Sequence, residues 1–144
     1  MSEDLKGKKI ILFDGVCVLC NNFIVFVAKK DQKDNFRFLP IQNKNVDQFV
    51  DIQKINIREL NSIVLISGDN LKYKSNAAIE ILTNLNKIFL FCKVFYVIPK
   101  KIRDIIYDFI ANNRYHFFGK VENCSIVKSK ANNKILKDKI ISDL

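Results

Sequence analysis

Two cysteines, Cys17 and Cys20, are separated by two residues near the start of this 144-residue chain, a spacing that serves redox or metal chemistry. They follow an apolar run and a glycine, at the predicted start of a helix. Residues three apart on a helix share a face, so the two sulfur atoms can reach each other. Unpaired N–H groups at a helix start favour negative charge on the first sulfur. We therefore expect Cys17 to be the attacking and more exposed thiolate, and Cys20 to be the resolving thiol.

Two alternatives for this pair are a structural role and a metal site. Small buried cysteines on a helix face need no chemistry of their own. A structural zinc site needs four ligands, and the remaining soft ligands, Cys92, His116 and Cys124, form no second close pair. We expect Cys92 to lie in the core. Cys124 is expected to be either a third redox thiol or a buried cysteine without a redox role. Redox chemistry with no metal, and with no cofactor beyond an external thiol, is therefore the favoured prediction.

Asp14 stands three residues before the first cysteine and has two possible roles. A buried carboxylate near the pair opposes thiolate formation by like charge, yet it can accept a proton from the resolving thiol. A strand-end aspartate also commonly bonds the backbone of the turn or helix that follows. Phosphatases of the haloacid dehalogenase type end a strand with Asp-x-Asp-Gly, but position 12 is Leu12. Without that nucleophile, phosphoryl transfer is excluded.

The elements that must position these residues follow from the hydrophobic pattern. Apolar runs predict strands over 9–13, 36–41 and 62–66, and alternation after a Gly-Asp-Asn turn predicts a fourth over 71–74. Helical spacing predicts helices over 17–30, 45–50 and 75–85, the last with Ser75 as its N-cap. The predicted order of elements is β-α-β-α-β-β-α. We interpret it as two parallel crossover units, an antiparallel hairpin and a final helix, which is the order of an α/β thioredoxin-like fold. The cysteine pair lies at the first strand–helix junction, where that fold places its redox pair.

Additional C-terminal helices are predicted beyond residue 86. Residues 88–97 are apolar nearly all round, Pro99 ends that segment, and an apolar stripe over 102–110 predicts an amphipathic helix that Asn112 and Asn113 end. We expect these segments to cover the wide apolar face of the first helix. A single domain over 1–144 is predicted, with a core over about 8–86, a helical extension over about 87–118 and a polar tail over about 124–144 that forms at most one weak helix.

The composition limits the functional classes. Hydrophobic residues make up 49% and charged residues 27%, as is usual for a globular protein. The net charge is +9, from 24 basic and 15 acidic residues, but the lysines are scattered and form no basic stripe, so a nucleic-acid partner is not expected. No apolar stretch reaches the roughly 18 uncharged residues of a membrane helix, and no signal peptide precedes the first strand. We expect a cytoplasmic protein with no integral membrane segment.

The motif at 14–20, Asp-x-x-Cys-x-x-Cys after a hydrophobic strand, resembles the signature of the DCC family of thiol-disulfide oxidoreductases. The similarity extends along most of the chain, through a Ser-x-Ala helix start at 75–77, Asn-Arg-Tyr at 113–115 and Phe-Gly at 118–119. It implies a thioredoxin-like fold. It also implies exchange between a disulfide-containing substrate, either a protein or a small thiol compound, and an external thiol reductant.

One departure from ordinary thioredoxins concerns substrate docking. Thioredoxins carry a cis-proline before the third strand, whereas residues 59–62 contain no proline, so strand-like docking of an extended substrate is not predicted there. Asn113 and Arg114 are candidate substrate-binding residues instead. Arg114 either stabilises the thiolate or binds an acidic substrate group, or it bonds backbone carbonyls as a basic residue near a helix end. The aromatic residues Tyr115, Phe117 and Phe118 are expected in the core.

The sequence therefore predicts a thiol-disulfide oxidoreductase in which Cys17 attacks a disulfide and Cys20 resolves the mixed disulfide. The alternative is a binding or adaptor module on the same scaffold, with structural or metal-binding cysteines. Its contact surface would be the apolar segment 88–98, which suits a partner or a membrane surface. The basic residues that flank this segment are Lys87, Lys100, Lys101 and Arg103.

Overall fold

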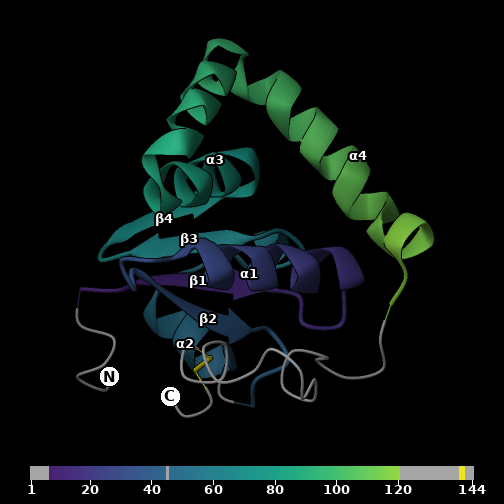
Figure 1. The fold of residues 1–144 in the computed structure, drawn as a ribbon. Helices are drawn as coiled ribbons and strands as arrows, with labels where there is room; N and C mark the ends of the chain where they lie inside the picture. The colour runs from purple at the N-terminus through teal and green to yellow at the C-terminus, as the bar shows by residue number, and fades with distance from the viewer. Residues whose placement is uncertain (1–6, 45, 121–139, 142–144) are drawn as a thin grey trace.

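A computed structural model describes residues 7–44, 46–120, 140 and 141, and its central element is a mixed four-stranded sheet (Figure 1). The strand order is β2-β1-β3-β4. β1 pairs with β2 in parallel, whereas β3 is antiparallel to both β1 and β4. The predicted thioredoxin-like fold is confirmed, but the second crossover unit is antiparallel and not parallel as expected. The strands are β1 (Lys9–Phe13), β2 (Phe36–Pro40), β3 (Val64–Ser67) and β4 (Asn70–Tyr73).

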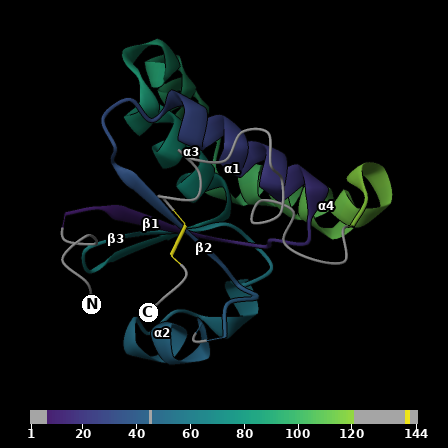
Figure 2. The same ribbon diagram turned by 60° about the horizontal axis from the view of Figure 1, so that its bottom comes forward.

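Helices cover both faces of the sheet, which explains why β1 is apolar at nearly every position (Figures 1 and 2). Ile11 and Phe13 point to the face covered by α1 (Val18–Lys30) and α3 (Lys74–Leu85). Ile10 and Leu12 point to the opposite face, covered by α2 (Val46–Ile52). Successive strand residues face opposite sides, so one short strand contributes to both halves of the core. A short 3-10 helix, η2 (Ile57–Glu59), precedes β3.

Two further helices form an arch that rises from the end of α3 and returns to the start of α1 (Figure 1). The arch consists of the 3-10 helix η3 (Lys87–Val97) and the α-helix α4 (Lys100–Phe118). α4 continues through Asn112 and Asn113, so the predicted helix end there is wrong. The helix ends at Gly119, whose φ of 87° is a backbone conformation that residues with a Cβ rarely adopt.

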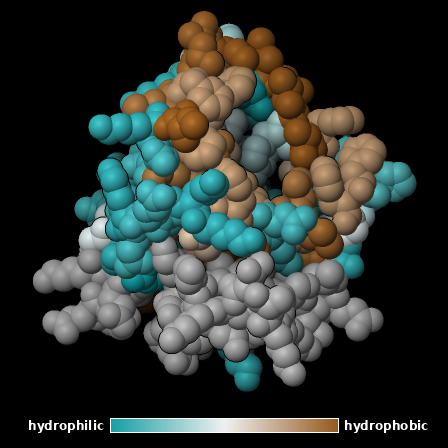
Figure 3. Space-filling view, viewed as in Figure 1, coloured by the Kyte–Doolittle hydropathy of each residue, from teal (hydrophilic) through white to brown (hydrophobic). Residues whose placement is uncertain are grey.

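The prediction that the arch covers the first helix is wrong for most of its apolar side chains. Phe89 does pack on the core and against the ring of Phe26, and Cys92 is buried as predicted. Many other apolar side chains of the arch face outward, over its apex and down α4 (Figure 3). Tyr115, Phe117 and Phe118 are also exposed, contrary to prediction. The exposed apolar residues of this surface include Phe91, Val94, Phe95, Val97, Ile98, Ile102, Ile105, Ile106 and Phe109.

Two other local predictions differ from the structure. Ser75 is not an N-cap: α3 begins one residue earlier, and the Ser75 hydroxyl donates a hydrogen bond to Asp104 of α4. In the polar tail, Ile140 pairs with Phe38 of β2 as an isolated bridge, and the N–H of Ile141 donates to the Phe38 carbonyl over 2.9 Å. This part of the tail therefore extends the sheet and is not helical. Cys124 lies outside the described residues, and no helix of the described part is both long and apolar enough to cross a membrane.

Candidate functional site

Cys17 and Cys20 lie at the start of α1, close together as their spacing predicts. Cys17 is the N-cap residue, with extended backbone angles, and its Sγ accepts a hydrogen bond from the backbone N–H of Cys20 over 3.3 Å. Both cysteines are free thiols in this structure. The helix start therefore concentrates donors on the first sulfur, as expected for an N-terminal helix position.

The two thiols differ strongly in acidity. The hydrogen bond from the Cys20 thiol, helped by the Cys20 N–H and the nearby Arg114 charge, outweighs burial and lowers the pKa of Cys17 to about 6. The same hydrogen bond, together with burial and the Cys17 charge, raises the pKa of Cys20 far above its usual value. At neutral pH the pair therefore holds one negative charge, on Cys17, and one proton, on Cys20.

The exposure of the two sulfurs is the reverse of the prediction. Cys17 has 0% of its surface exposed, whereas Cys20 is half-buried and lines a cavity. The chain segment that follows α4 returns to this point: Lys120 pairs with Cys17 as a β-bridge, and the Val18 N–H donates to the Gly119 carbonyl over 3.4 Å. The expectation that Cys17 is the more open thiol is therefore wrong, because a segment about 100 residues further along the chain lies beside it.

Asp14 is buried at the end of β1 and is surrounded by donors. Its carboxylate accepts hydrogen bonds from the Val16 N–H over 3.1 Å, from the Gln42 amide over 2.8 Å and from the Tyr115 hydroxyl. An ion pair of 2.9 Å joins it to Arg114. Burial by itself would raise the pKa of Asp14, but these donors and the Arg114 charge outweigh burial and lower it. Asp14 is thus an ionised residue that bonds the turn backbone, and an ionised carboxyl of low pKa is a weak proton acceptor.

Arg114 comes from α4 and connects that helix to the site. It is 6% exposed, pairs with Asp14 and donates to the backbone carbonyl of Asn61, just before β3. Its guanidinium also lies over the Tyr115 ring, 4.9 Å from the centroid. As one of the predicted roles has it, Arg114 bonds a backbone carbonyl, but this carbonyl belongs to the segment before β3 and not to the end of its own helix. The Arg114 charge also lies close enough to favour the Cys17 thiolate. The Asn113 amide donates to the Phe109 carbonyl of its own helix over 2.8 Å, and Asn113 is not among the residues that line the cavity described below.

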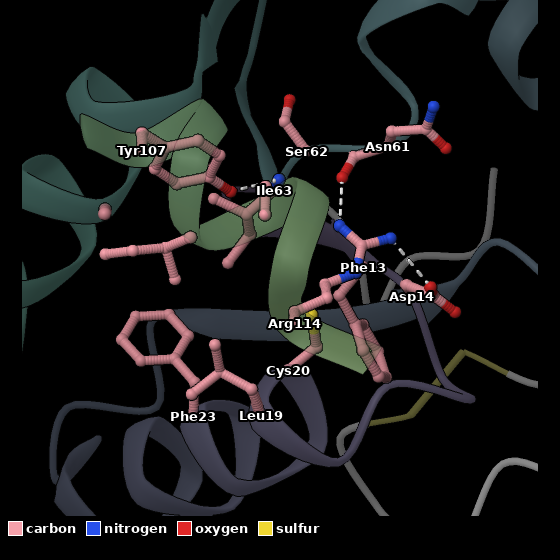
Figure 4. A pocket seen from close by; sticks show the side chains of 13 residues that line it. Phe13, Asp14, Leu19, Cys20, Phe23, Asn61, Ser62, Ile63, Tyr107 and Arg114 are labelled. Atoms are coloured by element: carbon pink, nitrogen blue, oxygen red, sulfur yellow. Dashed lines mark hydrogen bonds and ion pairs between the residues drawn. The ribbon is translucent and has the colours of Figure 1, made fainter. Parts of the chain in front are cut away.

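A cavity of about 240 Å³ lies beneath the arch, next to Cys20 (Figure 4). Its walls come from the end of β1, from α1, from the segment before β3, from α3 and from α4. Figure 4 shows the Cys20 sulfur among aromatic and aliphatic side chains, with the Asp14–Arg114 pair at one side. The apolar walls are formed by Phe13, Leu19, Phe23, Ile63, Ala78, Ile110 and Ala111.

Two polar residues of the site were not found by sequence reasoning. The Tyr107 hydroxyl lines the cavity and accepts the Ile63 N–H over 2.9 Å. Tyr107 precedes Arg114 by seven residues, two helical turns on the same face of α4, so helical spacing is the signal that points to it. Gln42 accepts the Gly15 N–H and donates to Asp14, both over 2.8 Å. No pattern in the sequence distinguishes Gln42 from other loop residues.

Across the part of the chain that the structure describes, no three histidine, cysteine or acidic side chains are grouped closely enough to hold a metal ion. The predicted absence of a metal site concerns the whole chain and stays a prediction.

Comparison with known proteins gives one family and two curated relatives. A sequence model of the DCC1-like thiol-disulfide oxidoreductase family matches residues 11–120. The uncharacterised protein YuxK of Bacillus subtilis is 32% identical over 126 residues, covering 88% of this chain and 92% of YuxK. A DCC family protein of Arabidopsis thaliana, described as chloroplastic, is 32% identical over 120 residues, covering 83% of this chain and 70% of the relative. No solved structure matches the chain.

Proposed function

Because the chain belongs to the DCC1-like thiol-disulfide oxidoreductase family, we propose that it catalyses thiol–disulfide exchange with Cys17 and Cys20 as its redox pair. The observation that carries the proposal is the place of Cys17 at the N-cap of α1, where its Sγ accepts a hydrogen bond from the Cys20 N–H over 3.3 Å and its pKa is lowered to about 6. A thiolate is the reactive form of cysteine, and a protonated neighbour can supply the proton that a departing thiolate needs. The pair lies at the start of α1, and Cys20 lines a cavity that a substrate sulfur can enter.

In the reducing direction, the Cys17 thiolate attacks one sulfur of a substrate disulfide, and the other sulfur leaves as a thiolate. Cys20 then loses its proton and attacks the Cys17 sulfur of the mixed disulfide, which releases the second substrate thiolate and closes the Cys17–Cys20 disulfide. Two electrons pass to the substrate, and an external thiol restores the dithiol. Since Cys17 is covered, this direction requires the segment at Gly119 and Lys120 to move away from the start of α1.

In this mechanism Asp14 and Arg114 hold the site together and set its charge. Arg114 favours the Cys17 thiolate, and Asp14 keeps Arg114 in place through their ion pair. Binding of an acidic substrate group by Arg114 and a site role for Asn113 stay predictions. A cytoplasmic location also stays a prediction, and the word chloroplastic describes the plant relative alone.

A redox titration tests the proposed activity. The purified protein is equilibrated in glutathione buffers of varied ratio, and its free thiols are counted by alkylation and mass spectrometry. We expect a reversible two-electron couple that the substitutions Cys17→Ser and Cys20→Ser each abolish, whereas Cys92→Ser leaves it unchanged because Cys92 lies in η3 and is buried in another part of the molecule. Thiols that never pair at any glutathione ratio would refute the activity.

The exposed arch favours a second candidate function, that of a module that docks on an anionic lipid surface. Between Lys87 and Arg103 the chain carries five basic residues and no acidic one, among apolar side chains that face outward. Apolar residues that insert at the headgroup level, flanked by cations, are the features that bind peripheral proteins to anionic bilayers. The charge of the segment is therefore complementary to such a surface.

Vesicle flotation tests the docking function. Phosphatidylcholine vesicles with and without a fraction of phosphatidylserine are mixed with the protein and centrifuged. We expect flotation only with the anionic vesicles, and its loss in Phe91→Ser/Val94→Ser, whose positions are both 62% exposed. Ile52→Ser on α2, outside the arch and 66% exposed, is the control variant. Self-association at the arch or binding to neutral vesicles alone would contradict this candidate.

A further inference from the structure

The two sulfurs of the pair differ in access as well as in charge. Cys17 has no exposed surface, whereas Cys20 lines the cavity beneath the arch. A nucleophile that enters this cavity therefore meets Cys20 first. We propose that the cavity binds the apolar part of a small thiol substrate, whose sulfur attacks Cys20 in the oxidised Cys17–Cys20 pair; this inference rests on the exchange activity proposed above.

The cavity has room for an apolar group and offers little to a charged one. Its volume of about 240 Å³ exceeds the roughly 150 Å³ that suffices for benzene in an apolar protein cavity. The charged groups at its edge, Asp14 and Arg114, already pair with each other over 2.9 Å, which leaves the buried Arg114 Nε as the one nitrogen of that guanidinium without a hydrogen-bond partner among the described residues. The Tyr107 hydroxyl already accepts the Ile63 N–H. Burying an apolar group here is favourable, whereas burying a charge without a partner is costly.

The backbone groups that an extended peptide would need are occupied by the chain itself. Just before β3, the Asn61 carbonyl accepts a hydrogen bond from Arg114, and the Ile63 N–H donates to Tyr107. On the other side of the pair, Lys120 forms a β-bridge with Cys17. Strand-like pairing of a peptide substrate needs free main-chain donors and acceptors. A small thiol needs none, so the geometry favours it over a protein substrate.

The chemistry of the step balances in electrons and protons. A substrate thiolate attacks the Sγ of Cys20, the Cys17–Cys20 bond breaks, and Cys17 leaves as a thiolate. A second substrate thiolate then attacks the substrate sulfur of the mixed disulfide; the substrate disulfide is released and Cys20 takes up a proton. Two thiols are oxidised to one disulfide, and an external low-molecular-weight disulfide reoxidises the pair. The low pKa of Cys17, about 6, makes it a good leaving group.

The test compares two small thiols of similar acidity, the neutral aromatic benzyl mercaptan and the anionic 2-mercaptoethanesulfonate. Each is mixed with the oxidised full-length protein, the reaction is stopped with N-ethylmaleimide, and mass spectrometry counts the modified cysteines. Because an apolar ring gains from burial in the cavity, we expect benzyl mercaptan to react at least about tenfold faster. Peptide mapping of the intermediate should place the benzylthio group on Cys20 and maleimide on Cys17.

Variants that fill the cavity provide the control. Ala111→Phe in α4 and Ala78→Leu in α3 place bulk in two different walls, so both should bring the ratio of the two rates close to one. Asn112→Phe lies on the same helix at an exposed position and should keep the preference of the unmodified protein. Circular dichroism and the glutathione titration establish that each variant is folded and redox-active.

The outcomes separate this inference from the proposed function. If neither thiol reduces the pair and no couple is found with glutathione, the exchange activity itself is refuted. If the couple is reversible but the two thiols react at equal rates, the cavity does not select an apolar substrate. If the benzylthio group is found on Cys17, the entry point at Cys20 is wrong. In the last two cases the exchange activity is retained, and the proposal that an apolar thiol attacks Cys20 from the cavity is refuted.

Discussion

At the scale of single residues, the acidity of Cys17 connects its ionisation to the stability of the folded protein. The pKa of Cys17 is about 6 in the folded chain and near 8.5 in an unfolded one, so ionised Cys17 stabilises the fold. This stabilisation is fully present above about pH 8.5 and is lost as the pH falls through about 6. The raised pKa of Cys20 has the opposite effect on stability. It destabilises the fold only as the pH rises above about 8.5, where the Cys20 thiol of the unfolded chain ionises.

We therefore expect the free energy of unfolding of the reduced protein, relative to Cys17→Ala, to decrease as the pH is lowered from about 8.5 to about 6. Urea denaturation of both proteins at several pH values measures this difference. Cys92→Ala, which removes a buried thiol outside the pair, serves as the reference for simple loss of packing. A difference that stays constant across the window would mean that folding does not lower the pKa of Cys17.

The Asp14–Arg114 ion pair gives a second prediction at this scale. Both side chains are nearly inaccessible, with 4% and 7% of their surface exposed, so Arg114→Met leaves the buried Asp14 carboxylate without its cationic partner. We expect a loss of about 3–5 kcal/mol in the free energy of unfolding. The double variant Asp14→Asn/Arg114→Met should lose less than the sum of the two single variants.

The ion pair Lys100–Asp104 on the same helix is the control for this cycle, since its Lys100 side chain is 60% exposed. Lys100→Met should cost less than about 1 kcal/mol. Additive effects of Asp14→Asn and Arg114→Met, measured by denaturant unfolding, would show that the two residues act independently. Asp14→Asn should also slow reduction of a mixed disulfide at neutral pH, because it weakens the hold on Arg114 beside the pair.

At the scale of elements, the end of α4 determines how closely the chain covers Cys17. Gly119 has φ 87° and ψ 171°, a region that only glycine adopts without strain. A Cβ there would have its nearest neighbour at 4.0 Å, so the cost of Gly119→Ala is conformational, about 1–3 kcal/mol. We expect this variant to loosen the segment beside Cys17 and to speed alkylation of Cys17 in the reduced protein.

The matched control is Gly68→Ala in the turn between β3 and β4. Gly68 also has a positive φ, 58°, with no atom within 4 Å of an added Cβ. Gly68→Ala should cost about 1 kcal/mol without changing the alkylation rate of Cys17. If the two variants change the Cys17 rate equally, the cover at Gly119 does not control access.

The accuracy of the sequence-based expectations differs between elements for physical reasons. β1 has the predicted bounds, because an apolar run closed by Asp14 and Gly15 leaves few alternatives. The pair at the start of α1 is also found where expected. The cover of Cys17 was missed because Gly119 and Lys120 reach it only through the path of α4, which local patterns do not specify. The apolar stripe of α4 shows that one side of a helix is hydrophobic, but not what lies against it.

At the scale of the whole molecule, we propose that the arch and the sheet belong to one domain, as the sequence predicts. Arg114 and Tyr107 of α4 bond the segment before β3, and Phe89 of η3 packs on the core. We therefore expect one cooperative unfolding transition, with far-ultraviolet circular dichroism and exposure of Cys92 to alkylation changing together. Separate transitions for the two signals would show that the arch unfolds independently of the sheet.

The ion pair between Asp14 and Arg114 joins residues that are 100 positions apart in the sequence. During synthesis, β1 and α1 leave the ribosome before α4 has been made. In the nascent chain, Cys17 and Cys20 therefore lack the Arg114 guanidinium beside them and are not covered by α4. We expect a ribosome-bound chain halted before residue 100 to react with alkylating agents at both Cys17 and Cys20. Formation of α4 thus turns an open pair of nascent thiols into a selective one.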